Sequence, residues 1–291
     1  MHKKYKSRAK INLSLDIKGK MENGYHEVDM IMQKIDLFDE IYMKIIPKGI
    51  KIESNCIYLP TDSRNIVYKA AEMMIDKYKL KSGIYIYIEK NIPISAGLAG
   101  GSTNAATVIQ GINEMFKIGL SQKNMMSLGV GLGADVPFFF MSGAARAEGI
   151  GEKLTPVKGL SDIWIVVTKA NLSVSTMKVY DSLVPNDYRI HPDIEGMIQA
   201  LKDENIYMIS EKLGNVLENA TFRLYPVVEK DKKLMKSFGA KGVLMSGSGP
   251  SIFGLFSKSD HAKAAYKNFS KINGQTFLVK TYGGGDTNGS I

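Results

Sequence analysis

Cysteine is nearly absent from this sequence, and histidine is scarce. Its 291 residues include one cysteine, Cys56, and four histidines. A single cysteine excludes a disulfide within the chain, and the histidines are too scattered to predict a metal cluster. No metal ligand can therefore be assigned from the sequence.

Long hydrophobic runs are also missing. No apolar run approaches the roughly 18 residues that a membrane helix requires. The basic N-terminal segment leads into an alternating pattern, Ile11 to Asp16, which differs from a signal-peptide core. Hydrophobic residues make up 44% and charged residues 23%, as in ordinary globular proteins. We therefore expect a cytoplasmic protein without a membrane partner.

The positive charge is not concentrated in one segment. The formal net charge is +9, but basic residues are spread along the chain with acidic neighbours, as in Lys230-Asp231-Lys232-Lys233. Clusters of basic and aromatic residues, typical of nucleic-acid binding, are missing. This pattern favours an anionic metabolite over nucleic acid as the partner.

Two familiar nucleotide-binding loops are excluded. The sequence contains no G-x-x-x-x-G-K-[ST] motif, which argues against a P-loop NTPase. Gly129 to Ala134 formally fits G-x-G-x-x-A, but it follows a segment of helical character and Pro137 interrupts what comes next. The strand–turn–helix context of a dinucleotide site is therefore missing.

A different glycine-rich stretch is the most informative part of the chain. Small residues fill almost every position of Pro93 to Ala106, between an alternating strand-like segment (84–89) and a helical one (105–113). Free N–H groups and the dipole at a helix start attract anions, and glycine lets phosphate oxygens approach the backbone. Such a loop alone is more often only structural, but its small-residue density and the Ser102-Thr103-Asn104 triplet predict phosphate binding.

Two charged residues stand out beside this loop. Asp135 lies between small residues and an apolar run, so we expect it at a tight turn beside buried surface, where a carboxylate needs a partner. Lys10 shares one face of a predicted strand with Asn12. Without further context, Asp135 would be interpreted as a turn residue and Lys10 as a solvated lysine.

The periodicity predicts an α+β protein with a boundary near residues 150–162. The predicted strands are 5–17, 28–35, 39–46, 84–89, 143–148, 151–156, 163–168, 241–245, 251–256 and 276–280. The predicted helices are 64–79, 104–116, 121–129, 175–183, 192–202, 206–213, 226–237 and 260–269. Asn23-Gly24 indicates a hairpin turn, and 283–291 is expected to be a flexible tail.

Three separated motifs together resemble those of the GHMP kinases, the superfamily of galactokinase, homoserine kinase and mevalonate kinase. They are Ala9-Lys10-Ile11-Asn12-Leu13, the loop Pro93 to Ala106, and Ser246-Gly247-Ser248-Gly249-Pro250-Ser251. The resemblance implies the two-domain GHMP kinase fold, with a ribosomal-protein-like N-terminal domain (1–155) and an α/β C-terminal domain (156–291). ATP and substrate are expected in the cleft between the two domains.

Further stretches are most similar to the branch of the superfamily that phosphorylates a CDP-linked methylerythritol. They are Asn23 to Val28, Ser63 to Val67 and Gly133 to Phe139. This branch transfers phosphate from ATP to a hydroxyl of CDP-methylerythritol, giving the 2-phosphate and ADP, in non-mevalonate isoprenoid synthesis. The sequence departs from the family at Asn23, usually aspartate, and in a less glycine-rich loop, with Ser95, Ala96 and Ala99.

The resemblance also implies roles for individual residues. Asp135 would be the general base that takes the hydroxyl proton, and Lys10 would pair with it. Mg²⁺ is expected with ATP, and Ser102 or Thr103 could approach it. The implied ATP-binding residues are Asn65 and Lys90 near the adenine, and Pro93, Ile94, Ser95, Ala96, Gly97, Leu98, Ala99, Gly100, Gly101, Ser102, Thr103 and Asn104. The implied substrate-binding residues are Asn12, Tyr25, His26 and Tyr180, although Tyr180 fits a core position on a helix equally well.

Two alternatives stay open at this point. One is a GHMP kinase for another alcohol of the homoserine or mevalonate type, against which Tyr25-His26 argues because those substrates carry no base to stack. The other is a non-catalytic nucleotide- or RNA-binding module, against which the presence of both Lys10 and Asp135 argues. A monomer or a homodimer is expected.

Overall fold

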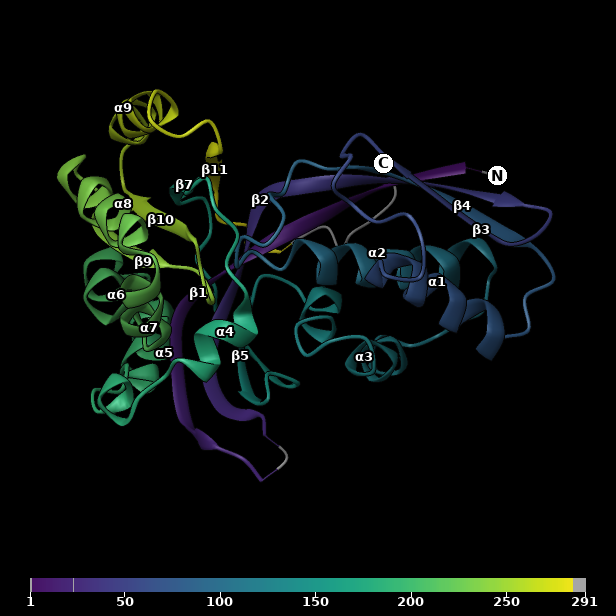
Figure 1. The fold of residues 1–291 in the computed structure, drawn as a ribbon, viewed down its shortest axis with the longest axis horizontal. Coiled ribbons are helices and arrows are strands. Elements are labelled where there is room, and N and C mark those ends of the chain that lie inside the picture. Colours follow the sequence, from purple (N-terminus) through teal and green to yellow (C-terminus); the bar gives the residue numbers. More distant parts are fainter. Residues whose placement is uncertain (1, 23, 285–291) are drawn as a thin grey trace.

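The computed structural model describes residues 2–22 and 24–284, which form two sheets flanked by helices (Figure 1). Within these residues, a seven-stranded sheet has the order β3-β4-β2-β1-β8, with β5 beside β2 and β6 beside β5, and a four-stranded sheet has the order β11-β7-β10-β9. The strands of the large sheet are β1 (His2–Lys20), β2 (His26–Ile46), β3 (Ile50–Ser54), β4 (Gly83–Glu89), β5 (Ala144–Gly149), β6 (Lys153–Val157) and β8 (Gly214–Asn215). Those of the small sheet are β7 (Trp164–Lys169), β9 (Gly242–Met245), β10 (Ser251–Phe256) and β11 (Thr276–Lys280).

The long hairpin of β1 and β2 runs through both halves of the molecule (Figure 1). The sequence predicts two strands where β2 runs unbroken, and this prediction is wrong. The reason is an irregularity in the ladder: Arg8 pairs with Phe38 but Lys10 pairs with Lys34, so three residues of β2 face one of β1. A bulge of this kind interrupts the alternating pattern without ending the strand.

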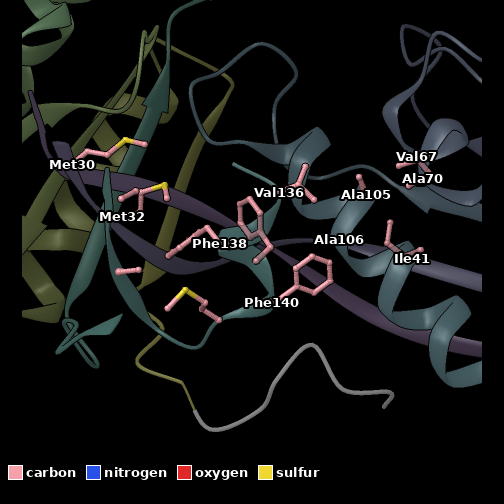
Figure 2. Close-up of a cluster of buried hydrophobic side chains, with 14 of the residues drawn as sticks. Met30, Met32, Ile41, Val67, Ala70, Ala105, Ala106, Val136, Phe138 and Phe140 are labelled. Carbon is pink, nitrogen blue, oxygen red and sulfur yellow. The ribbon is translucent and has the colours of Figure 1, made fainter. Parts of the chain in front are cut away.

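Helices cover one face of the large sheet. These are α1 (Ile66–Lys77), α2 (Gly100–Met115) and α3 (Gln122–Val130), followed by a 3₁₀ turn, η1 (Pro137–Phe140). Their apolar stripes pack on the inward side chains of the strands. In Figure 2, Val136, Phe138 and Phe140 from the η1 region lie between Met30 and Met32 of β2 and Ala105 and Ala106 of α2. The η1 segment that follows Asp135 is therefore fixed by the core.

The second half of the chain surrounds the small sheet with helices (Figure 1). They are α4 (Thr176–Asp181), η2 (Pro185–Tyr188), α5 (Ile194–Lys202), α6 (Ile206–Lys212), α7 (Leu217–Leu224), α8 (Pro226–Ser237) and α9 (Ser259–Ser270). The short strand β8 pairs in parallel with Ser14 and Leu15 of β1. The second half thus extends the sheet of the first, and the predicted α+β class is confirmed.

Several elements differ from the sequence-based expectation. The strands β3 and β8 and the helix α7 were not predicted, since each is short and depends on contacts with distant segments. Helix α2 begins at Gly100, about four residues early, and its N-cap is Ala99, which makes no side-chain cap bond. The predicted tail falls mainly on 285–291, outside the described residues, as does Asn23 of the predicted turn. Among the described helices, none has the length and apolar character to cross a membrane.

Candidate active site

A cavity of about 510 Å³ opens between the β1–β2 hairpin, the glycine-rich loop and the second half of the chain. From the first half it is lined by Lys10, Asn12, Leu15, Tyr25, Val28, Met30, Leu59, Lys90, Pro93, Ile94, Ser95, Ala96, Gly97, Ala99, Gly100, Gly101, Ser102, Ala134, Asp135 and Ile150. The second half adds Thr176, Tyr180, Leu217, Gly247 and Ser248. The cavity therefore collects most of the predicted site residues.

Lys10 and Asp135 meet in this cavity. The Nζ of Lys10 lies 3.9 Å from Oδ2 of Asp135 and donates a 2.6 Å hydrogen bond to Oδ1 of Asn12. Burial lowers the pKa of Lys10, while the charge of Asp135 opposes that shift. Asp135 sits in the tight turn between α3 and η1, as predicted, with its side chain 31% exposed. The pair thus places a carboxylate that can accept a proton beside a lysine charge.

The glycine-rich loop has a strained backbone that the second half of the chain holds in place. Ser95 and Ala99 adopt left-handed conformations, with φ of 51° and 55°, and Gly97 has φ of 73°. A Cβ at Gly97 would lie 2.1 Å from the carbonyl oxygen of Ser246. Ser246 also donates its Oγ hydrogen bond to the Gly97 carbonyl, at 3.0 Å. Glycine at 97 thus allows the two glycine motifs to pack directly together.

Helix α2 starts at the wall of the cavity. Gly100, Gly101 and Ser102, its first three residues, all line it. The N–H groups of a first helical turn have no partner within the helix, and the helix dipole adds partial positive charge there. Together with the loop backbone, this end of α2 can bind a phosphate.

Asp39 of β2, which the sequence analysis did not single out, holds both ends of the loop. This fully buried carboxylate accepts 2.7 Å hydrogen bonds from the backbone N–H groups of Asn91 and Ile92. Its other oxygen accepts a 2.9 Å bond from the Asn104 amide and pairs with the Lys90 ammonium. One side chain thus connects the segment that enters the loop with the first turns of α2.

Five predicted site residues do not line the cavity: Asn65, Leu98, Thr103, Asn104 and His26. The side chain of Asn65 caps α1 and donates to the carbonyl of Pro60 at 2.6 Å. Thr103 and Asn104 are buried, because the early start of α2 turns them toward Ser7 on β1. Asn65, Thr103 and Asn104 therefore stabilise the helices behind the cavity and do not face a ligand.

The hairpin end of the cavity is aromatic. Tyr25 is 60% exposed at its rim, and the rings of His26 and Tyr180 pack with centroids 5.1 Å apart. Burial, and then the charge of Asp135, raise the pKa of Tyr180, so its ring stays neutral. Burial, and then Lys20, lower the pKa of His26. Flat neutral rings at one end and a cationic, N–H-rich surface at the other suit a ligand with both a base and phosphates.

The C-terminal glycine motif is fixed by residues that carry no signal in the sequence. Asn215 of β8 donates two 2.8 Å hydrogen bonds, to the carbonyls of Met245 and Gly247. Thr176, at the start of α4, shares a 3.0 Å hydrogen bond with Ser248. Met245 lies 30 residues from Asn215, and Ser248 lies 72 residues from Thr176, so pairings of this kind emerge only in the folded chain.

Comparisons with known proteins agree with the geometry. Residues 65–143 match the family model for the GHMP kinases N terminal domain, and residues 197–274 match the model for the GHMP kinases C terminal domain. The chain is 49% identical over 282 residues to a 4-diphosphocytidyl-2-C-methyl-D-erythritol kinase of Alkaliphilus oremlandii, covering 96% of this chain and 97% of the relative. The chain belongs to the GHMP kinase family, in the branch of the 4-diphosphocytidyl-2-C-methyl-D-erythritol kinases. The family predicted from three motifs is therefore confirmed.

Another relative and two solved structures are also similar to this chain. A Clostridium botulinum protein with the same kinase name is 44% identical, covering 95% of this chain and 99% of the relative. A crystal structure of a 4-(cytidine 5'-diphospho)-2C-methyl-D-erythritol kinase superposes with a TM-score of 0.84 at 31% identity, covering 98% of this chain and all of the other. A homoserine kinase from Cytophaga hutchinsonii has a TM-score of 0.79 at 19% identity over 100% of this chain and 97% of the other, a likeness of fold alone.

Proposed function

We propose that this GHMP kinase transfers the γ-phosphoryl group of ATP to a hydroxyl of 4-diphosphocytidyl-2-C-methyl-D-erythritol. The products are the 2-phosphate of that substrate and ADP, a step of non-mevalonate isoprenoid synthesis. The observation that carries the proposal is the Lys10–Asp135 pair, which lies in one cavity with the glycine-rich loop and Tyr25 and Tyr180. Relatives of up to 49% identity that carry this kinase name support the choice of acceptor.

Asp135 and Lys10 carry the chemical step in this proposal. Asp135 accepts the proton of the acceptor hydroxyl, because an alcohol is a poor nucleophile until that proton can leave. The buried ammonium of Lys10, oriented by Asn12, stabilises negative charge on the transferring phosphoryl group and on the developing alkoxide. Lys10 is only 4% exposed, and a low-dielectric environment strengthens both interactions.

The glycine-rich loop binds the triphosphate. Every residue of the segment 93–102 lines the cavity except Leu98, whose side chain belongs to the core. The Lys90 ammonium, which pairs with Asp39, lies beside Gly100 at the start of α2. Asn65, Thr103 and Asn104 contribute to ATP binding indirectly, because they hold α1 and α2 in position.

Magnesium accompanies ATP in this proposal. The Ser102 hydroxyl lines the cavity beside the loop, and an oxygen donor of this kind suits Mg²⁺. Within residues 2–22 and 24–284 there is no group of three or more His, Cys, Asp or Glu side chains that could hold a metal, so most ligands would come from phosphates and water. The ion would neutralise phosphate charge.

The hairpin end of the cavity binds the cytidine. Tyr25 and Tyr180 present rings for stacking on the base, and His26 orients Tyr180 through their ring contact. Asn12 and Thr176 add polar groups to the lining of the cavity. We further propose domain limits of 1–155 and 156–291, a cytoplasmic location, a monomer or homodimer, and no nucleic-acid partner.

The experiment that tests the proposal measures ADP release with Mg-ATP and four alcohols: CDP-methylerythritol, mevalonate, homoserine and galactose. We expect turnover with CDP-methylerythritol alone. Turnover with another alcohol would keep the kinase chemistry and contradict the cytidine pocket. ATP binding without turnover on any alcohol would contradict catalysis and favour a nucleotide-binding module, for which nucleic-acid affinity that falls steeply with salt is the expected sign.

A further inference from the structure

A second cavity, of about 420 Å³, lies in the C-terminal half and shares no residue with the active cavity. It is formed where α8, the segment after β7 and the segment between α9 and β11 come together (Figure 1). Its lining consists of Ala170, Asn171, Val227, Asp231, Ile272, Asn273, Gly274 and Gln275. The proposed kinase reaction gives this cavity no role.

The unusual member of this lining is Asp231. The residue is only 8% exposed, although its neighbours in the sequence are three lysines. Among the described residues it has no ion pair and no side-chain hydrogen bond. Two of the neighbouring lysines pair elsewhere, Lys232 with Glu218 and Lys233 with Glu229. Its oxygens are not among the fully buried polar atoms that lack a partner, so the carboxylate is accessible from the cavity, where a cationic ligand could pair with it.

The rest of the lining indicates the charge and shape of that ligand. Asn171 and Gln275 carry carboxamides, which can accept hydrogen bonds from a cation, while the side-chain oxygen of Asn273 already accepts from the Gln275 backbone N–H at 3.3 Å. In the part of the chain that the structure describes, no lysine or arginine lines the cavity. Val227 and Ile272 provide apolar walls. A single carboxylate is too little for a divalent metal, since Ca²⁺ and Mg²⁺ sites gather several oxygen ligands, usually more than one of them charged.

We propose that this cavity binds a small primary alkylammonium ion, whose charged group donates to Asp231 and whose aliphatic part packs on Val227 and Ile272. The ammonium would donate hydrogen bonds to the carboxylate and supply the positive partner charge that Asp231 lacks. Burial raises the pKa of Asp231, in agreement with an acid that has no cationic neighbour of its own. The site is independent of the kinase reaction, so either proposal can fail without the other.

Thermal unfolding in n-butylammonium chloride at pH 7.5 tests this site, with NaCl holding the ionic strength constant. We expect a saturable rise in Tm of about 2–4 °C for the unaltered protein. Asp231→Asn keeps the shape but removes the charge, and it should abolish the rise. Asp260→Asn removes an exposed carboxylate of α9 and should leave the rise unchanged. KCl and MgCl₂ in place of butylammonium should give no comparable rise.

A second variant keeps the test decisive if Asp231→Asn folds poorly. Val227 lies one helical turn before Asp231 and is 43% exposed, so Val227→Lys can place its own ammonium beside the carboxylate. This variant should have a higher Tm without ligand and should no longer respond to butylammonium. Equal responses of the unaltered protein and Asp231→Asn, no response at all, or an equal response to K⁺ would overturn the proposal.

Discussion

At the scale of single residues, the account depends on Lys10 and Asp135. They are 125 positions apart in the sequence, and the structure places Nζ and Oδ2 3.9 Å from each other. Motif resemblance could predict the pair, because each residue lies in a short stretch of distinctive composition. The sequence could not predict that Asn12 would accept a hydrogen bond from Lys10, because that contact depends on the side-chain geometry of β1.

The substitution Asp135→Asn tests the base directly. The amide cannot take the hydroxyl proton, so kcat should fall about 10²–10⁴-fold. ATP affinity should change little, because the loop backbone and α2 carry most of the phosphate contacts in our proposal. Steady-state kinetics and ATP titration calorimetry give the two quantities, and turnover close to that of the unaltered protein would refute the assignment.

The lowered pKa of Lys34 predicts how the stability of the protein depends on pH. The residue is 3% exposed, and its Nζ donates to the carbonyls of Phe139 and Met141 at 3.0 and 2.6 Å, behind the turn that holds Asp135. Burial, and then the charge of Arg8, lower its pKa from 10.5 to about 7. Between these values the unfolded chain binds more protons at this lysine than the folded one, so stability rises with pH.

We therefore expect the free energy of unfolding, relative to Lys34→Met, to increase as the pH rises from about 7 toward 10.5. The slope should be at most about 1.4 kcal/mol per pH unit. Urea unfolding of both proteins at several pH values measures it, and Lys10 contributes equally to each. Parallel pH curves for the two proteins would contradict a lowered pKa at Lys34.

At the scale of elements, the glycine-rich loop is the decisive segment. Its composition alone predicted a strand, an anion-binding loop and a helix, and the structure has β4, the loop and α2 in that order. The start of α2 was misplaced because glycine pairs rarely lie inside helices, whereas Gly100 and Gly101 form its first turn. Asp39 was missed because its partners, residues 90–92 and 104, are more than 50 positions away.

Gly97→Ala tests the contact between the loop and the C-terminal glycine motif. The new Cβ would lie 2.1 Å from the Ser246 carbonyl oxygen, so the two segments must separate. We expect a stability loss of about 1–3 kcal/mol and weaker ATP binding. Gly119→Ala is the matched control, because Gly119 also has a positive φ, 82°, but nothing lies near its Cβ position. Equal losses in both variants would mean that backbone strain, and not the contact, is responsible.

Asp39→Asn tests the connection between the two ends of the loop. The amide keeps one acceptor oxygen and loses the other. It also loses the negative charge that balances Lys90. The KM for ATP should rise about tenfold or more, since a displaced loop misplaces the phosphates. The KM for the acceptor should stay nearly constant. Asp36→Asn, on an exposed carboxylate of the same strand, is the control, and an unchanged KM for ATP in folded Asp39→Asn would contradict the role.

At the scale of the whole molecule, both halves of the chain are needed for the cavity. The first half supplies Lys10, Asp135 and the loop, and the second supplies Tyr180 and Ser248. The motifs predicted this shared cleft through family resemblance. They could not predict that β8 would join the large sheet beside β1, because a two-residue strand has no periodicity to detect.

The aromatic end of the cavity gives the most direct test of the central claim, that the acceptor is recognised through its cytidine. The measurement is kcat/KM for CDP-methylerythritol and for methylerythritol without CDP, in the unaltered protein and in Tyr25→Ala. We predict that the unaltered protein strongly prefers the CDP-linked alcohol, and that Tyr25→Ala loses about 1–3 kcal/mol of that preference, mainly through KM. Equal use of both alcohols, or an unchanged preference in Tyr25→Ala, would contradict the account.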